Sequence, residues 1–388
     1  MTSYVQPDRE TDGHRAAADL CMVIADLSAG GAQRVFSQLA NAWAAEGRII
    51  TVVTFSDAQV DFFPLVPEIR RISLGGLKPS PGLFNAVAAN FRRLHALRRA
   101  FKDSGADRIL SFTGSMNVLA VLAARGLDLW VSISERNDPT RQSLGRIWNV
   151  LRRWSYPMAD KVTANSHGAV EALAAFVPRE KLAFVPNPIA PAPSSMAAVL
   201  PGPSILNVGR LSPQKAQDVL IAAFADLAGE FPDWRLVIVG TGEWEETLRA
   251  QAGQLGIADR VLFIGQIDDP FPYYRAARIF ALPSRFEGTP NAMLEAMSVS
   301  MPCIVSDASR GPLEYVEDGI SGLVVAVGDA GKLSAAMRRL MADPEWASTL
   351  GDRGRENLSL HSLEAVLGVW AEVLGLPPTQ ADQLTVDR

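Results

Sequence analysis

The stretch Ile205-Leu-Asn-Val-Gly-Arg-Leu-Ser-Pro-Gln-Lys215 carries the pattern on which the fold prediction rests. It begins with a mainly apolar run over 205–209, and after a short polar loop a helical pattern follows over 215–229. Apolar runs without strict alternation are typical of strands covered on both faces, as in parallel sheets. The stretch therefore predicts a strand, a loop and a helix, which together form the repeating unit of an α/β fold.

The same unit recurs along the chain, with further helical patterns over 31–46 and 331–341. The expected strands are 20–27, 49–55, 108–112, 129–133, 161–165, 182–186, 205–209, 235–240, 260–265, 278–282, 302–306 and 322–325. A chain of 388 residues has room for two domains of roughly 100–200 residues each. We expect an α/β protein with two doubly wound, Rossmann-like domains that face each other across a cleft.

A proline-rich segment marks the expected boundary between these domains. It runs from Pro186-Asn-Pro-Ile-Ala-Pro-Ala-Pro to Pro201-Gly-Pro-Ser, and proline stiffens a connection. The predicted division is a flexible tail over 1–18, an N-terminal domain over 19–190, a linker over 191–204, a C-terminal domain over 205–360, and a C-terminal helix with a tail over 361–388. This last helix could cross back to the N-terminal domain.

Charge and cysteine content exclude several classes of protein. Residues 1–190 carry a net charge of +5 and the remaining residues −10, which is unlike a general nucleic-acid binder. The two cysteines, Cys21 and Cys303, are far apart, as is typical of a reduced compartment. The N-terminus lacks the apolar core of a signal peptide, and no apolar run approaches the ~20 residues of a membrane span. We expect a cytoplasmic protein.

Glycine pairs follow two of the predicted strands. Gly30 and Gly31 lie in Ser28-Ala-Gly-Gly-Ala-Gln-Arg34 at the start of a helical pattern, where backbone amides can approach an anion closely. Gly240 and Gly242 follow the strand predicted over 235–240. Each pair is also compatible with a simple tight turn.

Cations and carboxylates gather in two other loops of the second half. Arg210 and Lys215 flank a short turn, so both charges can converge on one diphosphate. Glu287 and Glu295 are eight residues apart, and Glu295 lies on a helix that is predicted to begin near Pro290. Free amides over 288–291 would then point into the cleft. Solvated surface cations and a glutamate that stabilises the helix dipole are the alternative interpretations.

Other kinds of catalytic site lack their sequence signatures. No Asp-x-Asp occurs, and His14, His95, His167 and His361 have no metal-binding spacing, so we expect no metal ion. No Gly-x-Ser-x-Gly occurs either, which disfavours an acyl-transfer triad.

Taken in order, the motifs resemble those of glycosyltransferase family 4, which consists of retaining enzymes with the GT-B fold. The motifs are Gly30-Gly31-x-x-Arg34, Gly209-Arg210-x-x-x-x-Lys215, Gly240-x-Gly242 and Glu287-x7-Glu295. The segment Ile133-Ser-Glu-Arg-Asn-Asp-Pro139 is similar to bacterial members that build lipopolysaccharide, capsule or lipid-linked oligosaccharides. The resemblance implies transfer of a hexose or N-acetylhexosamine from a nucleotide sugar, expected to be a UDP-sugar, to a lipid-linked or polysaccharide acceptor, without a cofactor.

The resemblance also implies roles for individual residues. The C-terminal domain would bind the donor, with Arg210 and Lys215 on the leaving diphosphate, Glu287 on the transferred sugar and Glu295 on the ribose. Glu287, Lys215 and Arg210 are the expected catalytic residues. Further donor-binding residues would be Gly30, Gly31, Gly240, Gly242, Gly288, Thr289, Pro290 and Asn291. The N-terminal domain would bind the acceptor, and its candidate residues are Arg34, Arg136 and Asn137.

Three departures from the family pattern are visible. Glu135-Arg-Asn occupies a region where many members have a histidine near the donor sugar, which weakens the assignment of that contact. Thr289 replaces a bulky apolar residue, and Ser300 replaces a usual glycine. Two other functions remain open: a sugar-nucleotide epimerase of the same fold, which would need acid–base groups beyond Glu287, and a non-catalytic binding protein.

Two basic segments of the first half predict docking on an anionic membrane surface. Residues 69–102 contain eight basic residues and no acidic one, with Phe91, Leu94, Leu97 and Phe101 at helical spacing. Residues 141–154 contain four arginines, two tryptophans and no acidic residue. Basic amphipathic helices of this kind suit anionic lipid, although the apolar stripe could instead pack on the sheet. The expected location then extends to the inner face of the cytoplasmic membrane.

Overall fold

A computed structural model describes residues 19–57, 59, 61–75, 83–137, 139–140, 144–189 and 195–377. The expected tail over 1–18, the residues after 377 and positions 190–194 of the proline-rich segment lie outside this part of the chain.

The N-terminal domain is built on a seven-stranded parallel sheet with the order β3-β2-β1-β4-β5-β6-β7. Its strands are β1 (Leu20–Val23), β2 (Ile50–Thr54), β3 (Arg70–Ser73), β4 (Arg108–Phe112), β5 (Trp130–Glu135), β6 (Lys161–Ala164) and β7 (Leu182–Phe184). Its helices are α1 (Gly31–Ala45), α2 (Leu83–Ser104), α3 (Gly114–Ala124), α4 (Arg146–Ser155) and α5 (His167–Leu173), with 3₁₀ turns at Tyr156–Met158 and Arg179–Lys181.

The C-terminal domain is built on a six-stranded parallel sheet with the order β10-β9-β8-β11-β12-β13. Its strands are β8 (Ser204–Val208), β9 (Arg235–Val239), β10 (Val261–Gly265), β11 (Ile279–Leu282), β12 (Cys303–Ser306) and β13 (Leu323–Val325). Helices α6 (Gln217–Ala225), α7 (Glu245–Gln254), α8 (Phe271–Ala276), α9 (Asn291–Ser298), α10 (Arg310–Leu313), α11 (Ala330–Ala342), α12 (Pro344–Glu356) and α13 (Leu363–Leu374) follow, with 3₁₀ turns at Pro213–Lys215, Ala258–Arg260 and Ser359–His361.

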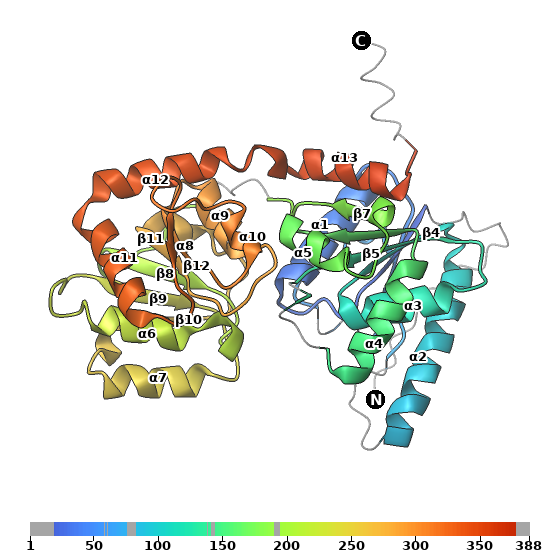
Figure 1. The fold of residues 1–388 in the computed structure, drawn as a ribbon, viewed down its shortest axis with the longest axis horizontal. Helices are drawn as coiled ribbons and strands as arrows, with labels where there is room; N and C mark the ends of the chain where they lie inside the picture. The colour runs from blue at the N-terminus through green and yellow to red at the C-terminus, as the bar shows by residue number, and fades with distance from the viewer. Residues whose placement is uncertain are drawn as a thin grey trace, which may run out of the picture.

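Both sheets are doubly wound, because the strand order reverses direction at β1 in the first domain and at β8 in the second. Helices cover both faces of each sheet, which explains why most strands are continuous apolar runs in the sequence. The predicted fold class, α/β with two Rossmann-like domains, is confirmed. Figure 1 shows the two domains side by side, each with its own sheet.

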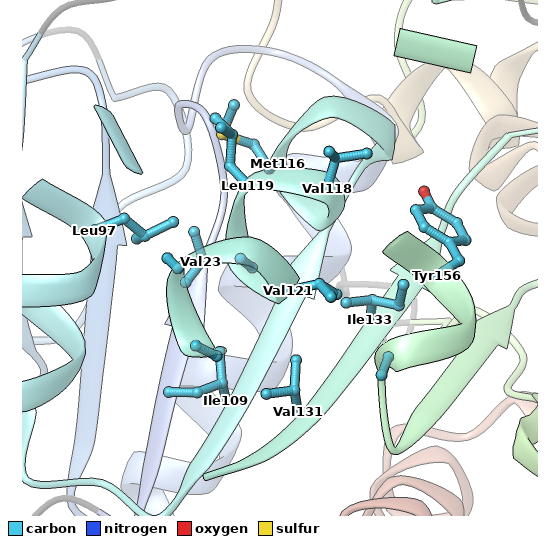
Figure 2. Packing of buried hydrophobic residues seen from close by; sticks show 14 of the residues in the cluster. Val23, Leu97, Ile109, Met116, Val118, Leu119, Val121, Val131, Ile133 and Tyr156 are labelled. Atoms are coloured by element: carbon cyan, nitrogen blue, oxygen red, sulfur yellow. The ribbon is translucent and has the colours of Figure 1, made fainter. Parts of the chain in front are cut away.

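One face of the N-terminal sheet is covered by α2 and α3. Figure 2 shows Leu97 of α2 and Leu119 of α3 packed near Val23 and Ile109, which belong to neighbouring strands. Removing such side chains from water stabilises the domain by about 1.5–3 kcal/mol for each large residue.

The chain returns to its first domain at the C-terminal end. Helix α12 packs on the C-terminal domain, and α13 continues onto the N-terminal domain (Figure 1). Trp370 of α13 is fully buried there and stacks on Phe112 of β4 with ring centroids 5.9 Å apart. The two domains are therefore connected both by the segment after β7 and by the segment between α12 and α13.

The structure differs from the sequence-based expectations at the outer edge of the N-terminal sheet and in the segment after β8. The edge strand β3 was not predicted, because Arg70 and Arg71 interrupt the apolar pattern and its residues are only partly buried. The helix expected over 215–229 is broken instead. Lys215 ends a 3₁₀ turn, Ala216 has a left-handed backbone with φ of 54°, and α6 begins at Gln217.

The two basic segments for which membrane docking was expected, over 69–102 and 141–154, differ in how their apolar residues are buried. On α2 most of the apolar stripe packs on the sheet, since Leu97 and Phe101 are fully buried, although Phe91 is 67% exposed. Most of that stripe therefore packs on the sheet, which was the alternative to membrane docking. On α4 the apolar residues Ile147, Val150 and Trp154 are all exposed. Lys78 and Arg141 lie outside the described residues. Among the helices that are described, none combines the length and the apolar character needed to cross a bilayer.

Candidate active site

The functional loops predicted from the sequence follow the carboxyl ends of strands in both sheets. Gly30 and Arg34 follow β1, whereas Lys215 follows β8 and Glu287 follows β11. Ligands of doubly wound sheets bind at this edge. Hydrogen bonds between loops of different domains show that the two carboxyl edges face each other.

Lys215 and Glu287 form an ion pair. Lys215 Nζ lies 2.6 Å from Glu287 Oε1, and both side chains are largely buried. The backbone N–H of Glu287 donates to Ser309 Oγ at 2.7 Å, which holds the middle of the loop between β11 and α9. The structure thus brings together a cation and a carboxylate that are 72 residues apart in sequence.

Glu295 lies on α9 and connects the two domains. Its Oε1 is 2.5 Å from Nη1 of Arg34 on α1, and its Oε2 accepts a hydrogen bond from the hydroxyl of Tyr274 at 3.0 Å. Burial raises the pKa of Glu295, while the charge of Arg34 and the hydrogen bond from Tyr274 lower it. The sequence suggested Arg34 as an acceptor-side group, and in the structure it contacts a residue expected to bind the donor.

The loop before α9 lies against the N-terminal domain. Thr289 Oγ1 donates to the carbonyl of Asn165, and Asn291 Nδ2 donates to the carbonyl of Gly31 at 3.0 Å. Pro290 occupies the N-cap position of α9. At Gly288 a Cβ atom would come within 2.9 Å of the carbonyl oxygen of Arg136, so only glycine allows this approach.

Asn187, in the proline-rich segment, joins these loops. Its Nδ2 group donates to the carbonyl of Thr289 at 3.0 Å and to Oδ1 of Asn291 at 2.5 Å. Its Oδ1 accepts from Arg136 of the N-terminal domain, and its carbonyl accepts from Nδ1 of His361 at 2.9 Å. The sequence analysis did not single out Asn187; the only available signal was its position between Pro186 and Pro188.

Arg136 and Asn137 lie on the N-terminal side of this interface. Burial lowers the pKa of Arg136 to about 9, and its guanidinium stacks over the ring of Phe112 at 4.7 Å. The Cα atom of Asn137 lies 3.2 Å from the position a Cβ would take on Gly288. Both residues therefore contact the loop that contains Glu287.

Two family models match the chain. "Glycosyl transferase 4-like domain" matches residues 30–188 and "Glycosyl transferases group 1" matches residues 197–357, so together they cover most of both domains. The chain belongs to glycosyltransferase family 4.

This glycosyltransferase resembles bacterial enzymes over nearly its whole length. It is 26% identical over 356 residues to a Campylobacter jejuni α-1,4-N-acetyl-D-galactosaminyltransferase named for a GalNAc-containing, undecaprenol-linked substrate, covering 92% of this chain and 98% of that protein. It is 26% identical over 365 residues to the lipopolysaccharide core biosynthesis glycosyltransferase LpsE of Rhizobium meliloti, covering 90% of this chain and 97% of that protein.

A solved structure has the same two-domain fold. The Anabaena protein HepE, in complex with UDP and glucose, superposes with a TM-score of 0.78 at 19% identity and covers 93% of this chain and 100% of that chain. At this level of identity the likeness concerns the GT-B fold.

Glu135 lies at the end of β5, directly before Arg136. Its carboxylate is buried and accepts a hydrogen bond from the hydroxyl of Tyr156 at 2.7 Å. Burial raises the pKa of Glu135, and the hydrogen bond from Tyr156 lowers it. Glu135 thus belongs to an internal polar cluster, and Arg136 is the neighbouring residue at the interface.

Arg210 is the predicted site residue that the structure leaves apart from the others. It lies in the loop after β8 with an exposed side chain, and its guanidinium has no hydrogen bond or ion pair within the described ranges. Within the same ranges no three His, Cys, Asp or Glu side chains form a group that could hold a metal ion.

Gly240 and Gly242 bring the loop after β9 against the loop that leads to Lys215. A Cβ on Gly240, whose φ is +133°, would lie 2.1 Å from the carbonyl oxygen of Gly209. A Cβ on Gly242 would lie 2.1 Å from the carbonyl oxygen of Leu211. These glycines therefore set the position of the cation-bearing loop through backbone packing.

We predict that Gly240→Ala destabilises the protein by more than about 2 kcal/mol, because the methyl group clashes with backbone and the backbone conformation is strained. Gly253→Ala, on α7 where no atom lies within 4 Å of the added Cβ, is the control and should be neutral or slightly stabilising. Urea denaturation followed by circular dichroism measures both. Equal stabilities for the two variants would contradict the packing role of Gly240.

Proposed function

We propose that this glycosyltransferase transfers a hexose or N-acetylhexosamine from a UDP-sugar to a lipid-linked or polysaccharide acceptor, with retention of anomeric configuration and without a metal ion. The observation that carries the proposal is the pairing of Lys215 with Glu287, which puts a phosphate-binding cation and a hydroxyl-binding carboxylate at one point of the cleft. The UDP and glucose in the HepE structure support the donor class. The lipid-linked and lipopolysaccharide functions in the relatives' names support the acceptor class, and with it a role in cell-surface glycan synthesis.

The charged groups divide between the parts of such a donor. Lys215 and the exposed Arg210 bind the diphosphate, whose negative charge grows as the sugar leaves, so these cations do the work that a metal does in other transferases. Glu287 accepts hydrogen bonds from hydroxyls of the sugar. Glu295, oriented by Tyr274 and Arg34, accepts from the ribose hydroxyls. Arg34 therefore acts on the donor side in this proposal.

Donor binding must exchange existing contacts for new ones. Lys215 now neutralises Glu287, and a bound UDP-sugar offers the diphosphate to Lys215 and hydroxyl donors to Glu287. Each buried charge then keeps a partner, which avoids the cost of leaving one unpaired. Gly30 and Gly31 face the diphosphate from the N-terminal domain, beside the loop of Gly288, Thr289, Pro290 and Asn291.

Transfer breaks the bond between the anomeric carbon and the diphosphate oxygen and forms a bond from the same carbon to the acceptor oxygen. Retention follows when the acceptor hydroxyl attacks from the face that the diphosphate leaves. The departing phosphate oxygen then takes the proton of that hydroxyl. Arg136 and Asn137, which border the loop of Glu287, remain the acceptor-side candidates.

The proposal predicts separate effects on chemistry and on binding. Lys215→Ala should lower kcat by about 10²–10³, as for the loss of one donor that stabilises the transition state. Glu295→Ala should mainly weaken UDP binding. The matched control for Lys215→Ala is Lys332→Ala, which removes an exposed lysine on α11 and should leave kcat unchanged. The rates come from transfer reactions run with and without EDTA, in which a panel of nucleotide sugars is offered with lipid-linked acceptors. Mass spectrometry detects the products.

Near-wild-type turnover of Lys215→Ala would contradict its role. Activity that EDTA abolishes and Mg²⁺ restores would contradict metal independence. Interconversion of the nucleotide sugar without transfer would favour the epimerase instead.

We also propose that α4 docks on anionic lipid. Ile147, Val150 and Trp154 are exposed on this helix, with side chains 53–66% accessible, and the exposed Arg146 and Arg153 accompany them. Figure 1 shows α4, α3 and α2 on one side of the N-terminal domain, with α3 in contact with both of the others. Helix α2 also carries the exposed Phe91. Apolar side chains flanked by arginines are typical of helices that lie in a membrane interface.

The replacement of Ile147 and Trp154 together by Ser should abolish sedimentation with phosphatidylglycerol vesicles at low salt. It removes the exposed apolar side chains that would enter the lipid. Leu360→Ser, which changes an equally exposed leucine next to α13, is the control and should bind like the wild type. Wild-type binding should also weaken as salt is raised, since each basic residue contributes about 1 kcal/mol that salt screens. Failure of the wild type to bind at low salt would refute the docking.

A further inference from the structure

The two segments that connect the domains meet at Asn187. The first segment follows β7 and contains Asn187, and the second runs between α12 and α13 (Figure 1) and contains His361. A parallel β-bridge joins Ile189 to Ser362, and the backbone N–H of Ile189 donates to the carbonyl of His361 at 2.8 Å. Nδ1 of His361 donates to the carbonyl of Asn187 at 2.9 Å, and both side chains are buried. The two connections are therefore fixed to each other beside Asn187.

The backbone of Asn187 is restricted from both sides. Pro186 precedes it and Pro188 follows it. A proline ring fixes its own φ, and a residue that precedes proline is confined to extended conformations. The direction in which the side chain of Asn187 leaves the backbone is therefore largely set before any contact of that side chain forms.

The side-chain amide of Asn187 uses all its hydrogen-bonding capacity at the boundary between the domains. Its Nδ2 group donates to the carbonyl of Thr289 and to Oδ1 of Asn291, both in the C-terminal domain. Its Oδ1 accepts from the guanidinium of Arg136 and from Nδ2 of Asn165 at 3.4 Å, both in the N-terminal domain. An amide offers two donor hydrogens and two acceptor positions, so none remains unused.

These contacts allow only one orientation of the amide. If the group were turned by 180°, its nitrogen would face the donors of Arg136 and Asn165, and its oxygen would face two other oxygens. The donors of Asn187 therefore always face the C-terminal domain and its acceptor always faces the N-terminal domain.

The segment that Asn187 holds belongs to the loop of Glu287. Thr289 lies two residues after Glu287, and Asn291 is the first residue of α9. Asn291 also donates to the carbonyl of Gly31 on the N-terminal domain at 3.0 Å. Without the amide of Asn187, the oxygens of Thr289 and Asn291 would lose this donor, and a buried acceptor without a donor is costly. The segment would then shift, and Glu287 would shift with it.

We propose that Asn187 is a positioning residue for sugar transfer. Its amide fixes the loop of Glu287 against Arg136, so that groups from both domains keep one relative position during the reaction. This inference rests on the proposed transferase function. Its effect on the rate passes through the loop, and a displacement of reacting groups by about 1 Å can cost about 10²-fold in rate.

Asn187→Asp tests the inference, because the two side chains have nearly the same shape but a carboxylate has no donor. This variant loses both bonds to the loop and keeps an oxygen for Arg136. Asn187→Ala, which removes all the side-chain contacts, is the second variant. Asn41→Ala is the matched control. Asn41 also joins two segments, because it donates to the carbonyl of Pro64 at 3.1 Å and accepts from the N–H of Val66 at 3.0 Å, but it does so within the N-terminal domain.

Three quantities are measured for each protein. The first is kcat with the nucleotide sugar and acceptor that the transfer panel identifies, and the second is the affinity for UDP, by calorimetry. The third is hydrogen–deuterium exchange of the backbone amides over 287–294 and over 62–67, which needs no turnover.

Both Asn187 variants should lose at least about tenfold in kcat and keep the affinity for UDP within about twofold. Exchange over 287–294 should become faster in both. Asn41→Ala should keep the wild-type kcat and exchange faster only over 62–67.

A wild-type kcat and wild-type exchange in Asn187→Asp would overturn the inference. So would a loss of UDP affinity as large as the loss of kcat in both variants, because a general loss of structure produces that result. A wild type that transfers no sugar from any donor of the panel would instead refute the proposed function, so the two failures are distinguishable.

Discussion

The ion pair between Lys215 and Glu287 is the interaction on which the account of the cleft depends. It joins the loop after β8 to the loop after β11, and neither charge could be buried there without the other. Any ligand that separates them must supply an anion for Lys215 and hydrogen-bond donors for Glu287. A nucleotide sugar carries both groups close together, whereas phosphate alone or a simple sugar carries only one.

The arrangement of the domains makes this pair accessible to two substrates. Parallel strands place all their carboxyl ends at one edge, so the two facing edges bring loops from both domains to the same cleft. Asn187 then links Arg136 of the first domain to Thr289 and Asn291 of the second. Glu295 forms a second link through Arg34.

Much of the fold was predictable, because buried parallel strands leave continuous apolar runs that are easy to recognise. The edge strand β3 was not, since Arg70 and Arg71 interrupt the apolar pattern of a strand whose residues are only partly buried. The loops that contain Lys215 and Glu287 were predicted from residue type and position after a strand. Their direct contact, and the role of Asn187, arise from tertiary packing between segments distant in sequence, which no local pattern records.

The most direct test of the central claim is a crystal structure of the protein with a non-hydrolysable UDP-sugar. Lys215 Nζ, now 2.6 Å from Glu287 Oε1, should leave that carboxylate and bind a diphosphate oxygen together with Arg210. Glu287 should accept a hydrogen bond from the sugar. A nucleotide bound elsewhere, or bound here with the Lys215–Glu287 pair intact and no cation on the diphosphate, would contradict the account.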